Sequence, residues 1–598
     1  MFMQRTVTCG SLRAKDDKKT VVLNGWVHRI RNHGAIYFIN LRDRYGITQV
    51  VVEDDASKKL QKVASELHNE YTIAVKGVVR KRPKNMINKD MATGEVEVKA
   101  KDIEVLGKCK VLPFQVDDKT NASENLRLQY RYIDLRSDSM QKHIALRHEV
   151  VRAMREYLYA KDFYEIETPT LIRSTPEGAR DFVVPSRLYP GKFYALPQSP
   201  QLMKQLLMVS GFDKYFQVAR CYRDEDARGD RQLEFTQLDL EMSFVKRDDV
   251  LKLMEGMFGD VFKKTIGYKL PKKFRRIAYK DALNIYGSDK PDLRFDLPLQ
   301  DFKDLVLKSS FDAMKNLIGE KGSAKAIVIK KEYAEGMSRK VIEEYGEAAK
   351  AVGAKSISEK DKMFAYMKYQ GGEFSSGCAK YFNEIKNDVK SVLHIEDGDL
   401  IMIVADKTWK GACNGGGVVR SLLGKNLNLI DDSRFEFCWI IDFPLFAYNE
   451  EEGHWEAEHH MFSMPQERFI NTLESNPGEV LGDLYDLVLN GYEVASGSIR
   501  IHDTELQKRI FRICNYSDEN AEKAFGFLLK AFEYGAPPHG GIAPGVDRIV
   551  MIMAGEISIK EVIAFPKNTF AVSPMDDSPS ILDEKQLREL SLSVIEKK

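Results

Sequence analysis

The chain has 598 residues, of which 43% are hydrophobic and 30% are charged, and its formal net charge is +1. This composition is typical of a globular protein of about four domains, and no apolar run approaches the roughly 18 residues of a membrane span or resembles a signal peptide, so we expect a cytoplasmic protein. The seven cysteines are scattered and contain no CxxC pair, which argues against a disulfide framework and against a zinc site.

Basic residues gather in the N-terminal region, where 22 Lys plus Arg stand against 13 Asp plus Glu through Val111. Such a local excess is typical of a surface that binds a polyanion. Five segments with strand character, 20–30, 35–43, 46–54, 71–82 and 95–106, together with a helix over 57–67, predict a small β-barrel of the OB type in a domain spanning 1–115.

The predicted barrel presents a curved face on which aromatic, cationic and amide groups mix, as stacking on single-stranded bases and reading their edges require. The residues expected there are Arg31, Phe38, Gln49, Arg82 and Glu97, with His33 beside them. The alternative is a barrel whose basic face is simply solvated.

Residues 116–139 are polar and then basic and aromatic, which indicates a hinge with a short helix. A helix is predicted over 140–161, because apolar residues recur there every three or four positions. The strand FYEIETPTL follows it. The spacing by itself indicates a helix that packs in a core.

A loop near Glu177 precedes a helix whose start is indicated by Ser199 as N-cap and Pro200 in the first turn. Gln201 and Lys204 are three residues apart and should therefore share one face of this helix. A lysine beside an apolar face is usually a surface residue with its ammonium in water, so the ligand-binding interpretation competes with that one.

Residues 217–243 form the most informative stretch, two strands joined by a charged loop that contains Gly229. In the second strand, Phe235, Gln237, Asp239 and Glu241 alternate with apolar residues, so the strand has one polar and one apolar face. The charged loop, with Arg223 before it, can bend over a ligand on the polar face. A solvated hairpin with surface ion pairs is the alternative.

Residues 291–428 have strand and helix patterns of their own between glycine-rich borders, which predicts an inserted α+β domain. The flanking regions 140–290 and 429–598 would form one catalytic domain. In the second region the pair His459-His460 lies in a loop without a Cys or Asp at ligand spacing, which makes it a poor zinc site.

Three polar residues, Asp486, Glu493 and Arg500, lie on the strands that follow. Glu493 and Arg500 are seven apart, so a regular strand would place them on opposite faces. If both reach one ligand, we expect a bulge at Ser496-Gly497-Ser498. Further on, a glycine-rich turn opens a helix near Gly545, and Arg548 in its first turn indicates an anion site.

These motifs resemble those of class II aminoacyl-tRNA synthetases. The run Arg223, Asp224, Glu225, loop, Phe235 is similar to their second signature motif, and the run from Gly545 to Arg548 is similar to the third. Over essentially the whole chain, including the insertion, the detail resembles the bacterial-type aspartyl-tRNA synthetase family of subclass IIb. This implies a multidomain α+β protein with an N-terminal OB-fold barrel, an antiparallel catalytic sheet with a C-terminal extension, and an inserted α+β domain.

The resemblance also implies an activity and its partners: activation of L-aspartate with ATP and Mg²⁺ to aspartyl-adenylate, transfer to tRNA-Asp, and a homodimer. Arg223, Glu493 and Arg548 would be catalytic, and Asp486 and Glu493 would bind Mg²⁺. Aspartate would be bound by Glu177, Gln201, Lys204, Arg223, Asp239, His459, His460 and Arg500. ATP would be bound by Arg223, Asp224, Glu225, Gln232, Phe235, Glu493, Gly545, Val546, Asp547 and Arg548. The anticodon would be bound by Arg31, His33, Phe38, Gln49, Arg82 and Glu97.

Charge favours an acidic substrate, because Lys204 and Arg500 can neutralise a side-chain carboxylate, whereas asparagine would leave them unpaired. This disfavours lysyl and asparaginyl specificity. An asparagine-forming ligase on the same fold, independent of tRNA, is the rival enzyme, and the N-terminal barrel argues against it. His33 resembles the type that also charges tRNA-Asn; a strictly tRNA-Asp-specific enzyme remains the alternative.

Overall fold

The computed structural model describes residues 2–175, 178–352 and 361–595. Glu177, predicted to bind aspartate, lies outside these residues. The chain divides into two compact units, Met1–Gln141 and Lys142–Lys598. None of the described helices is long and apolar enough to cross a membrane.

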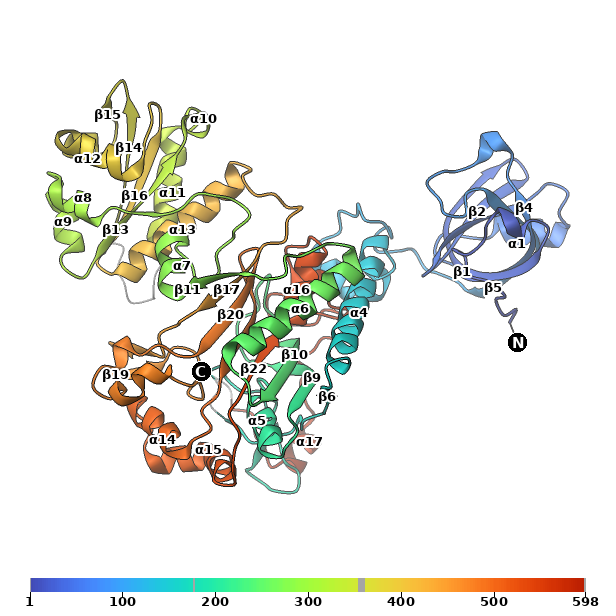
Figure 1. Cartoon of the computed structure of the whole chain (residues 1–598). Coiled ribbons are helices and arrows are strands. Elements are labelled where there is room, and N and C mark those ends of the chain that lie inside the picture. The colour runs from blue at the N-terminus through green and yellow to red at the C-terminus, as the bar shows by residue number, and fades with distance from the viewer. Residues whose placement is uncertain (1, 176–177, 353–360, 596–598) are drawn as a thin grey trace. The chain divides into compact units, whose positions relative to one another are not determined.

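The first unit is built on a closed five-stranded barrel of the predicted OB type (Figure 1). Its strands, in the order in which they pair, are β1 (Thr20–His33), β2 (Ile36–Asp43), β3 (Gly46–Val52), β5 (Val96–Gly107) and β4 (Thr72–Lys81). Alternate residues of β1, among them Val21 and Leu23, are buried in the barrel core. Helix α1 (Lys58–Ser65) begins at Ser57, whose hydroxyl accepts a hydrogen bond from the Leu60 N–H.

The hinge region contains two short helices, α2 (Glu124–Gln129) and α3 (Arg131–Asp134), and both belong to the first unit. Arg136 connects this region to the barrel, because its Nη1 donates to Oε2 of Glu70 over 2.9 Å and its guanidinium lies over the ring of Trp26. The hinge is therefore packed against the barrel along part of its length.

The second unit is organised around an eight-stranded sheet. Its neighbours are antiparallel except for the outermost pair at each edge. In spatial order the strands are β11 (Arg275–Ala278), β17 (Phe437–Ile441), β20 (Leu484–Leu489), β21 (Tyr492–Ile499), β22 (His539–Pro544), β10 (Glu234–Ser243), β9 (Lys214–Tyr222) and β6 (Tyr164–Glu165). The predicted class II antiparallel sheet is confirmed.

Helices cover one face of this sheet (Figure 1). Apolar residues of α4 (Asp138–Tyr159), α6 (Arg247–Ile266) and α16 (Val546–Met553) share a core with Leu238, Leu240 and Met242 of β10. The alternation along β10 therefore sends its apolar residues into this core, as predicted, and leaves its polar residues on the other face.

Smaller elements complete the second unit. They are the helices α5 (Gln201–Val209), α7 (Tyr279–Tyr286), α14 (Thr504–Ile513), α15 (Asp518–Phe532) and α17 (Glu584–Glu589), and the hairpins β7 (Val183–Pro185)–β8 (Phe193–Ala195) and β18 (Phe446–Asn449)–β19 (His454–Ala457). Helix α5 starts one residue later than Ser199 predicts: Pro200 takes the cap position, and the Ser199 hydroxyl accepts a hydrogen bond from the Gln201 N–H.

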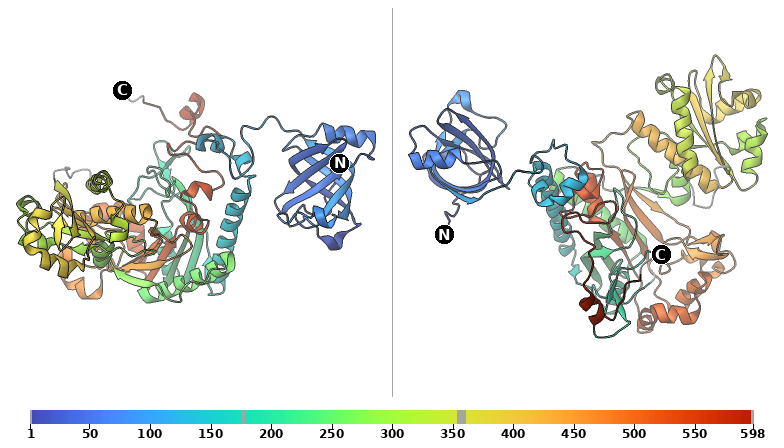
Figure 2. Two further views of the ribbon diagram at one scale, coloured as in Figure 1. Left: turned by 90° about the horizontal axis from the view of Figure 1, so that it is seen from above. Right: turned by 180° about the vertical axis from the view of Figure 1, so that it is seen from behind.

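The segment predicted as an insertion forms a sheet of its own, shown in yellow and green in Figure 2. Its strands are β12 (Gln300–Asp301), β13 (Ser323–Ile329), β16 (Leu400–Asp406), β14 (Lys362–Gln370) and β15 (Glu373–Ser375), and its helices are α8 (Lys303–Lys308), α9 (Asp312–Ile318), α10 (Lys331–Ala334), α11 (Arg339–Ala351), α12 (Lys386–Leu393) and α13 (Trp409–Asn426). Buried Arg420 of α13 donates hydrogen bonds to the carbonyls of Asp292, Phe295 and Leu297, so it fixes the chain where the insertion begins.

Candidate active site

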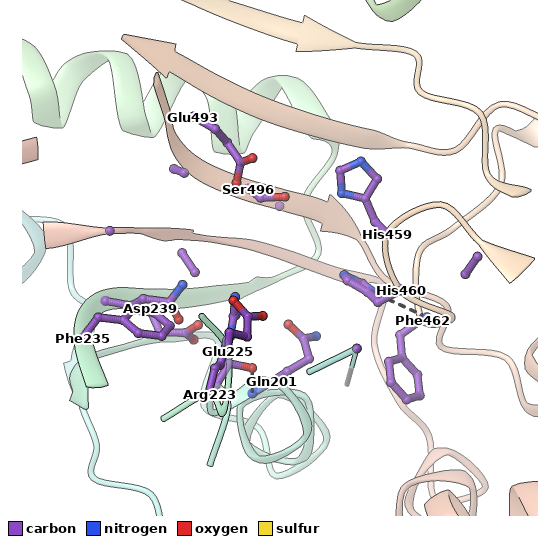
Figure 3. A pocket seen from close by; sticks show the side chains of 18 of the residues that line it. Gln201, Arg223, Glu225, Phe235, Asp239, His459, His460, Phe462, Glu493 and Ser496 are labelled. Carbon is purple, nitrogen blue, oxygen red and sulfur yellow. Dashed lines mark hydrogen bonds between the residues drawn. The ribbon is translucent and has the colours of Figure 1, made fainter. Parts of the chain in front are cut away.

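A cavity of about 810 Å³ lies on the polar face of the eight-stranded sheet (Figure 3). Strands β10, β21 and β22, helix α5, the first turn of α16 and the loop after β19 all contribute side chains to it. Segments that are up to about 380 residues apart in sequence, from Gly178 to Ile559, therefore converge on one pocket.

Arg223 and Phe235 stand together on one side of this cavity. The guanidinium carbon of Arg223 lies 5.1 Å from the centroid of the Phe235 ring. Two buried donors here, Nε of Arg223 and Nε2 of Gln201, find no hydrogen-bond acceptor among the described residues. Since a buried donor without an acceptor is costly, these two groups are suited to an anionic or carbonyl oxygen of a ligand.

Four buried charged residues form a network deeper in the cavity. The ammonium of Lys204 lies 3.0 Å from Asp239 and 3.1 Å from Glu241, and Nε of Arg500 donates to Glu241 over 3.0 Å. Lys204 is only 1% exposed, so the alternative of a surface lysine is wrong. Two cations and two carboxylates balance one another here, and each cation is held in place by an acid.

Arg500 has two further partners. Its Nη1 lies 2.7 Å from the Ser498 hydroxyl and 2.8 Å from Nε2 of His460. Burial, together with the charge of Arg500, lowers the pKa of His460 well below its usual range. The ring is therefore neutral and can accept this hydrogen bond. By contrast, Nη2 of Arg500 makes only long contacts, 3.4 Å to Glu241 and 3.5 Å to the Gly541 carbonyl, so it can donate to a ligand.

The two acids of the network differ in their proton affinity. Burial raises the pKa of Asp239 to about 6 despite the neighbouring Lys204. Burial also acts on Glu241, but the charges of Arg500 and Lys204 outweigh it and hold the pKa of Glu241 below its usual range. Asp239 is consequently the acid that takes up a proton first.

Asp486 and Glu493 lie on neighbouring strands on the same side of the sheet. Burial, and then the charge of Glu493, raise the pKa of Asp486 well above its usual range, and its Oδ1 has no hydrogen-bond partner among the described groups. Two close carboxylates that repel each other fit a hard divalent cation such as Mg²⁺, which would neutralise both.

The predicted bulge exists, but its predicted position is wrong. Leu487 pairs with Ala495 and Val488 with Glu493, so the extra residue is Val494, and residues 496–498 pair regularly with β22. The glycine and serines suggested the later position, whereas the Val494 carbonyl accepts a hydrogen bond from the Gly545 N–H and so fixes the earlier one. The bulge allows both Glu493 and Arg500 to line the cavity.

The start of α16 places Arg548 beside this bulge. Its Nη1 donates to the Glu493 carbonyl over 2.9 Å, and its Nη2 forms an ion pair with Asp230 at 3.1 Å. Gly545 also lines the cavity. The side chain of Val546 lies in the apolar core instead, so of this residue only the backbone remains for a nucleotide.

Four other predicted nucleotide ligands already have partners within the protein. Asp547 binds Nη1 of Arg147 and the Thr236 N–H, and the amide of Gln232 exchanges two hydrogen bonds with the backbone of Lys567. Glu225 forms an ion pair with Arg231 at the cavity wall. Asp224, which lies outside the cavity lining, is 3.6 Å from Arg180.

His459 lines the cavity, and its ring meets that of Phe443 edge-on at 4.7 Å. Burial lowers its pKa as well. Among the described residues the groups that could hold a metal include neither His459 nor His460.

Sequence reasoning missed two members of the site, Glu241 and Ser498. The period of two along β10 already placed Glu241 on the polar face, and this signal could have identified it. Ser498 gave no such signal: its role depends on the side chain of Arg500, two residues further along the chain.

On the barrel, strand pairing brings the six predicted nucleic-acid ligands together. Arg31 pairs with Phe38, the ring of His33 lies 6.0 Å from that of Phe38, and Gln49 stands opposite Asn40 on the same face. The Gln49 amide donates to Glu97 over 3.0 Å, and Glu97 lies 3.7 Å from Arg82. The Nη2 of Arg82 is buried without an acceptor among the described groups.

An antiparallel sheet with convergent cations, a buried carboxylate pair and an OB barrel on the same chain defines the architecture of class II aminoacyl-tRNA synthetases. The family model described as "tRNA synthetases class II (D, K and N)" matches residues 123–569, and the model "OB-fold nucleic acid binding domain" matches 21–106. The chain belongs to this family of class II tRNA synthetases.

Close relatives extend over the full chain. A protein of Treponema denticola named "Aspartate--tRNA(Asp/Asn) ligase" is 63% identical over 99% of this chain and 100% of its own length. A protein of Borreliella burgdorferi with the same name is 49% identical over 99% and 100%.

Solved structures share the fold. The asparaginyl-tRNA synthetase of Pyrococcus horikoshii complexed with asparaginyl-adenylate has a TM-score of 0.58 at 18% identity, covering 94% of this chain and 98% of its own. A putative aspartyl-tRNA synthetase of Leishmania major Friedlin has a TM-score of 0.59 at 19% identity, covering 95% of each.

Proposed function

We propose that the chain is an aspartate–tRNA ligase. It joins L-aspartate to ATP, forming aspartyl-adenylate and releasing pyrophosphate, and then transfers aspartate to a ribose hydroxyl at the 3′ end of tRNA-Asp. The observation that carries the proposal is the buried Lys204–Arg500 pair beside the donors of Arg223 and Gln201, which together suit a dicarboxylate. The shared name of close relatives supports it.

In the first step the α-carboxylate of aspartate attacks the α-phosphorus of ATP, and the bond to pyrophosphate breaks. Arg223 binds the carboxylate and the α-phosphate, and its unpartnered Nε is available for this. Phe235 stacks on the adenine, Glu225 accepts from its amino group, and Arg548 binds the terminal phosphate. Asp486 and Glu493 would hold Mg²⁺, which would supply positive charge for the phosphate oxygens.

The side chain of aspartate is read by charge. Lys204 and Nη2 of Arg500 bind its carboxylate. Asp239 binds the ammonium group of the substrate, and Gln201 helps to hold the substrate in the required orientation. The structure corrects the expectation that asparagine would leave these cations unpaired, since Asp239 and Glu241 already pair with them. Asparagine is disfavoured because its amide replaces a carboxylate in the charge-assisted hydrogen bonds to Lys204 and Arg500. The substrate is therefore aspartate and neither asparagine nor lysine.

Specificity for tRNA extends to tRNA-Asn in this proposal. His33 stands beside Phe38 on the barrel face, and relatives of up to 63% identity are named for both tRNAs. A strictly tRNA-Asp-specific enzyme is the alternative. Charging of purified tRNA-Asn with aspartate separates the two, since the strict enzyme gives no aspartyl-tRNA-Asn.

We further propose a cytoplasmic homodimer. Support for a dimer comes from large apolar side chains that are exposed around β6 to β8, including Tyr164 (66%), Val183 (56%) and Leu188 (70%). The surfaces of monomers rarely carry large apolar side chains gathered in one patch. Light scattering of the purified chain measures this state.

The experiment that tests the function is ATP–pyrophosphate exchange with aspartate, asparagine or lysine as the only amino acid. We expect exchange with aspartate alone, and loss of it by at least about 10³-fold in Arg223→Ala, the scale of removing a transition-state charge partner. Release of free asparagine without tRNA would support the asparagine-forming ligase instead. Wild-type exchange by a folded Arg223→Ala protein would remove Arg223 from the mechanism.

A further inference from the structure

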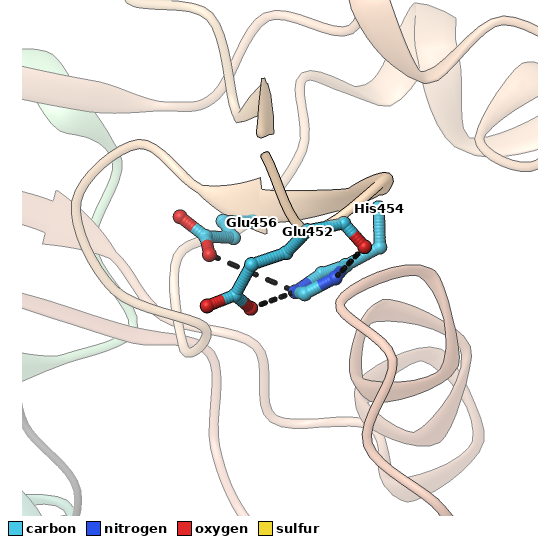
Figure 4. Close-up of side chains that lie close together, drawn as sticks. All are labelled: Glu452, His454 and Glu456. Carbon is cyan, nitrogen blue, oxygen red and sulfur yellow. Dashed lines mark hydrogen bonds and ion pairs between the residues drawn. The ribbon is translucent and has the colours of Figure 1, made fainter. Parts of the chain in front are cut away.

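Three side chains of the β18–β19 hairpin, Glu452, His454 and Glu456, converge at the mouth of the cavity (Figure 4). Their potential ligand atoms all lie within 4.8 Å of one another. The mechanism proposed above uses none of them, so their arrangement calls for a separate explanation.

The hairpin holds these side chains in place. His454 and Glu456 are two residues apart on β19 and point to one face, whereas Trp455 between them points to the other, where it is partly buried in the neighbouring core and lies 5.1 Å from the ring of Tyr448. The backbone pairing of β18 with β19, Tyr448 opposite Trp455, fixes the register.

The ring of His454 is oriented as in a metal ligand. Its Nδ1 lies 3.4 Å from the carbonyl oxygen of Glu452, which can only accept, so Nδ1 carries a hydrogen in this contact. When Nδ1–H is bonded to a carbonyl, the neutral ring presents its lone pair at Nε2. This Nε2 faces the two glutamates.

The two carboxylates stand at the distance that a shared metal ion requires. Oε2 of Glu452 and Oε1 of Glu456 are each 3.6 Å from Nε2 of His454, beyond a normal hydrogen bond. Ligands of a tetrahedral ion with bonds of about 2.0–2.2 Å lie about 3.4 Å apart. A small inward movement of three partly exposed side chains would therefore complete three coordination positions.

We propose that Glu452, His454 and Glu456 form a binding site for a divalent transition-metal ion of the zinc class, with water in the fourth position. One nitrogen and two carboxylate oxygens suit zinc, whereas the imidazole disfavours Mg²⁺ and Ca²⁺. The bound ion cross-links the turn to β19 and stiffens the hairpin at the cavity mouth. This site is separate from the Asp486–Glu493 pair and does not depend on the proposed catalytic activity.

The test is zinc binding to the full-length protein, stripped with a chelator and dialysed against Zn²⁺ in the presence of excess Mg²⁺. The Mg²⁺ occupies carboxylate-only sites, including the Asp486–Glu493 pair. We expect His454→Gln and Glu456→Gln each to lose one zinc equivalent per chain relative to the parent protein. Hydrogen exchange of the amides of residues 446–457 should slow on adding Zn²⁺ in the parent and stay unchanged in both variants.

His143 offers a matched control. Its Nδ1 also lies near a backbone carbonyl, that of Glu561 at 3.2 Å, and its Nε2 is 3.4 Å from Glu556. Among the described residues, however, His143 does not belong to a group of three side chains that could hold a metal ion. His143→Gln should therefore retain the zinc equivalent. The proposal is overturned if the parent binds no zinc under excess Mg²⁺, or if His454→Gln binds as much as the parent. Equal melting temperatures of the metal-free proteins exclude unfolding as the cause of a loss.

Discussion

Replacing Ser498 by alanine tests whether the recognition of aspartate depends on a positioned Arg500. The Ser498 hydroxyl is fully buried and accepts a hydrogen bond from Nη1 of Arg500 over 2.7 Å. A hydrogen bond to a charged group contributes about 1.5–3 kcal/mol, which corresponds to about 10- to 100-fold in an equilibrium constant. In Ser498→Ala, Nη1 of Arg500 keeps its contact with His460, and Nε keeps its hydrogen bond to Glu241. We therefore expect the lower end of this range, about a tenfold loss in kcat/KM for aspartate.

The assay is ATP–pyrophosphate exchange, with aspartate and ATP varied in turn. Arg500 lies among the groups proposed to bind aspartate, so KM for aspartate should rise while KM for ATP stays within about twofold, below the effect of one neutral hydrogen bond. Ser463→Ala is the control. Its hydroxyl donates to that of Ser498 over 3.0 Å, and among the described residues its side chain forms no hydrogen bond with Arg500, so its effect should be smaller.

Two results would refute this reasoning. If Ser498→Ala raises KM for ATP as much as KM for aspartate, the serine supports the whole pocket and has no specific effect on Arg500. If neither constant changes, Arg500 keeps its position without the serine or does not bind the substrate. A melting curve of each variant separates these outcomes from a loss of the fold.

The remaining predictions concern the barrel, the metal and the pH dependence. Phe38→Ala should reduce tRNA charging by at least about tenfold, the effect of one lost base stack of about 1–3 kcal/mol, and leave pyrophosphate exchange unchanged; equal losses would contradict a separate anticodon surface. Asp486→Asn should raise the Mg²⁺ concentration needed for half-maximal exchange, yet should not lower the melting temperature without Mg²⁺, because one of two repelling charges is gone. Aspartate kcat/KM should fall as the pH drops through about 6, where Asp239 takes up a proton, and Asp239→Asn should remove this limb. Since the folded state raises the pKa of Asp239 from 3.8 to about 6, its contribution to stability is largest below pH 4 and declines between pH 4 and 6; urea denaturation of both proteins across this range measures it.

Local patterns predicted the parts of the site that depend on strand alternation. Along β10 the period of two alone sent Leu238 and Leu240 to the core and Asp239 to the cavity. The same applies to the five barrel strands, whose lengths and turns are encoded within a few residues of each other. These features are short-range, so one sequence contains enough information to predict them.

Features set by distant partners could not be predicted from the sequence. The sequence around Lys204 predicts a surface residue, because its partners Asp239 and Glu241 lie 35 and 37 positions later in the chain. Arg500 likewise binds Glu241 across 259 positions. The bulge was placed wrongly for the same reason: glycine marks where a bulge is cheap, but the Gly545 N–H, far along the chain, determines that it forms at Val494.

The charge balance of the network explains why a pocket for an acidic substrate contains acids. Free Lys204 and Arg500 side chains would be disordered and mutually repelling, whereas Asp239 and Glu241 hold both cations in position before a ligand arrives. Binding then costs less side-chain entropy. The substrate brings a further side-chain carboxylate, and its own ammonium group, proposed to face Asp239, balances that charge. Because this contact requires ionised Asp239, whose pKa is about 6, aspartate binding should be accompanied by proton release near pH 6, which calorimetry in buffers of different ionisation enthalpy measures.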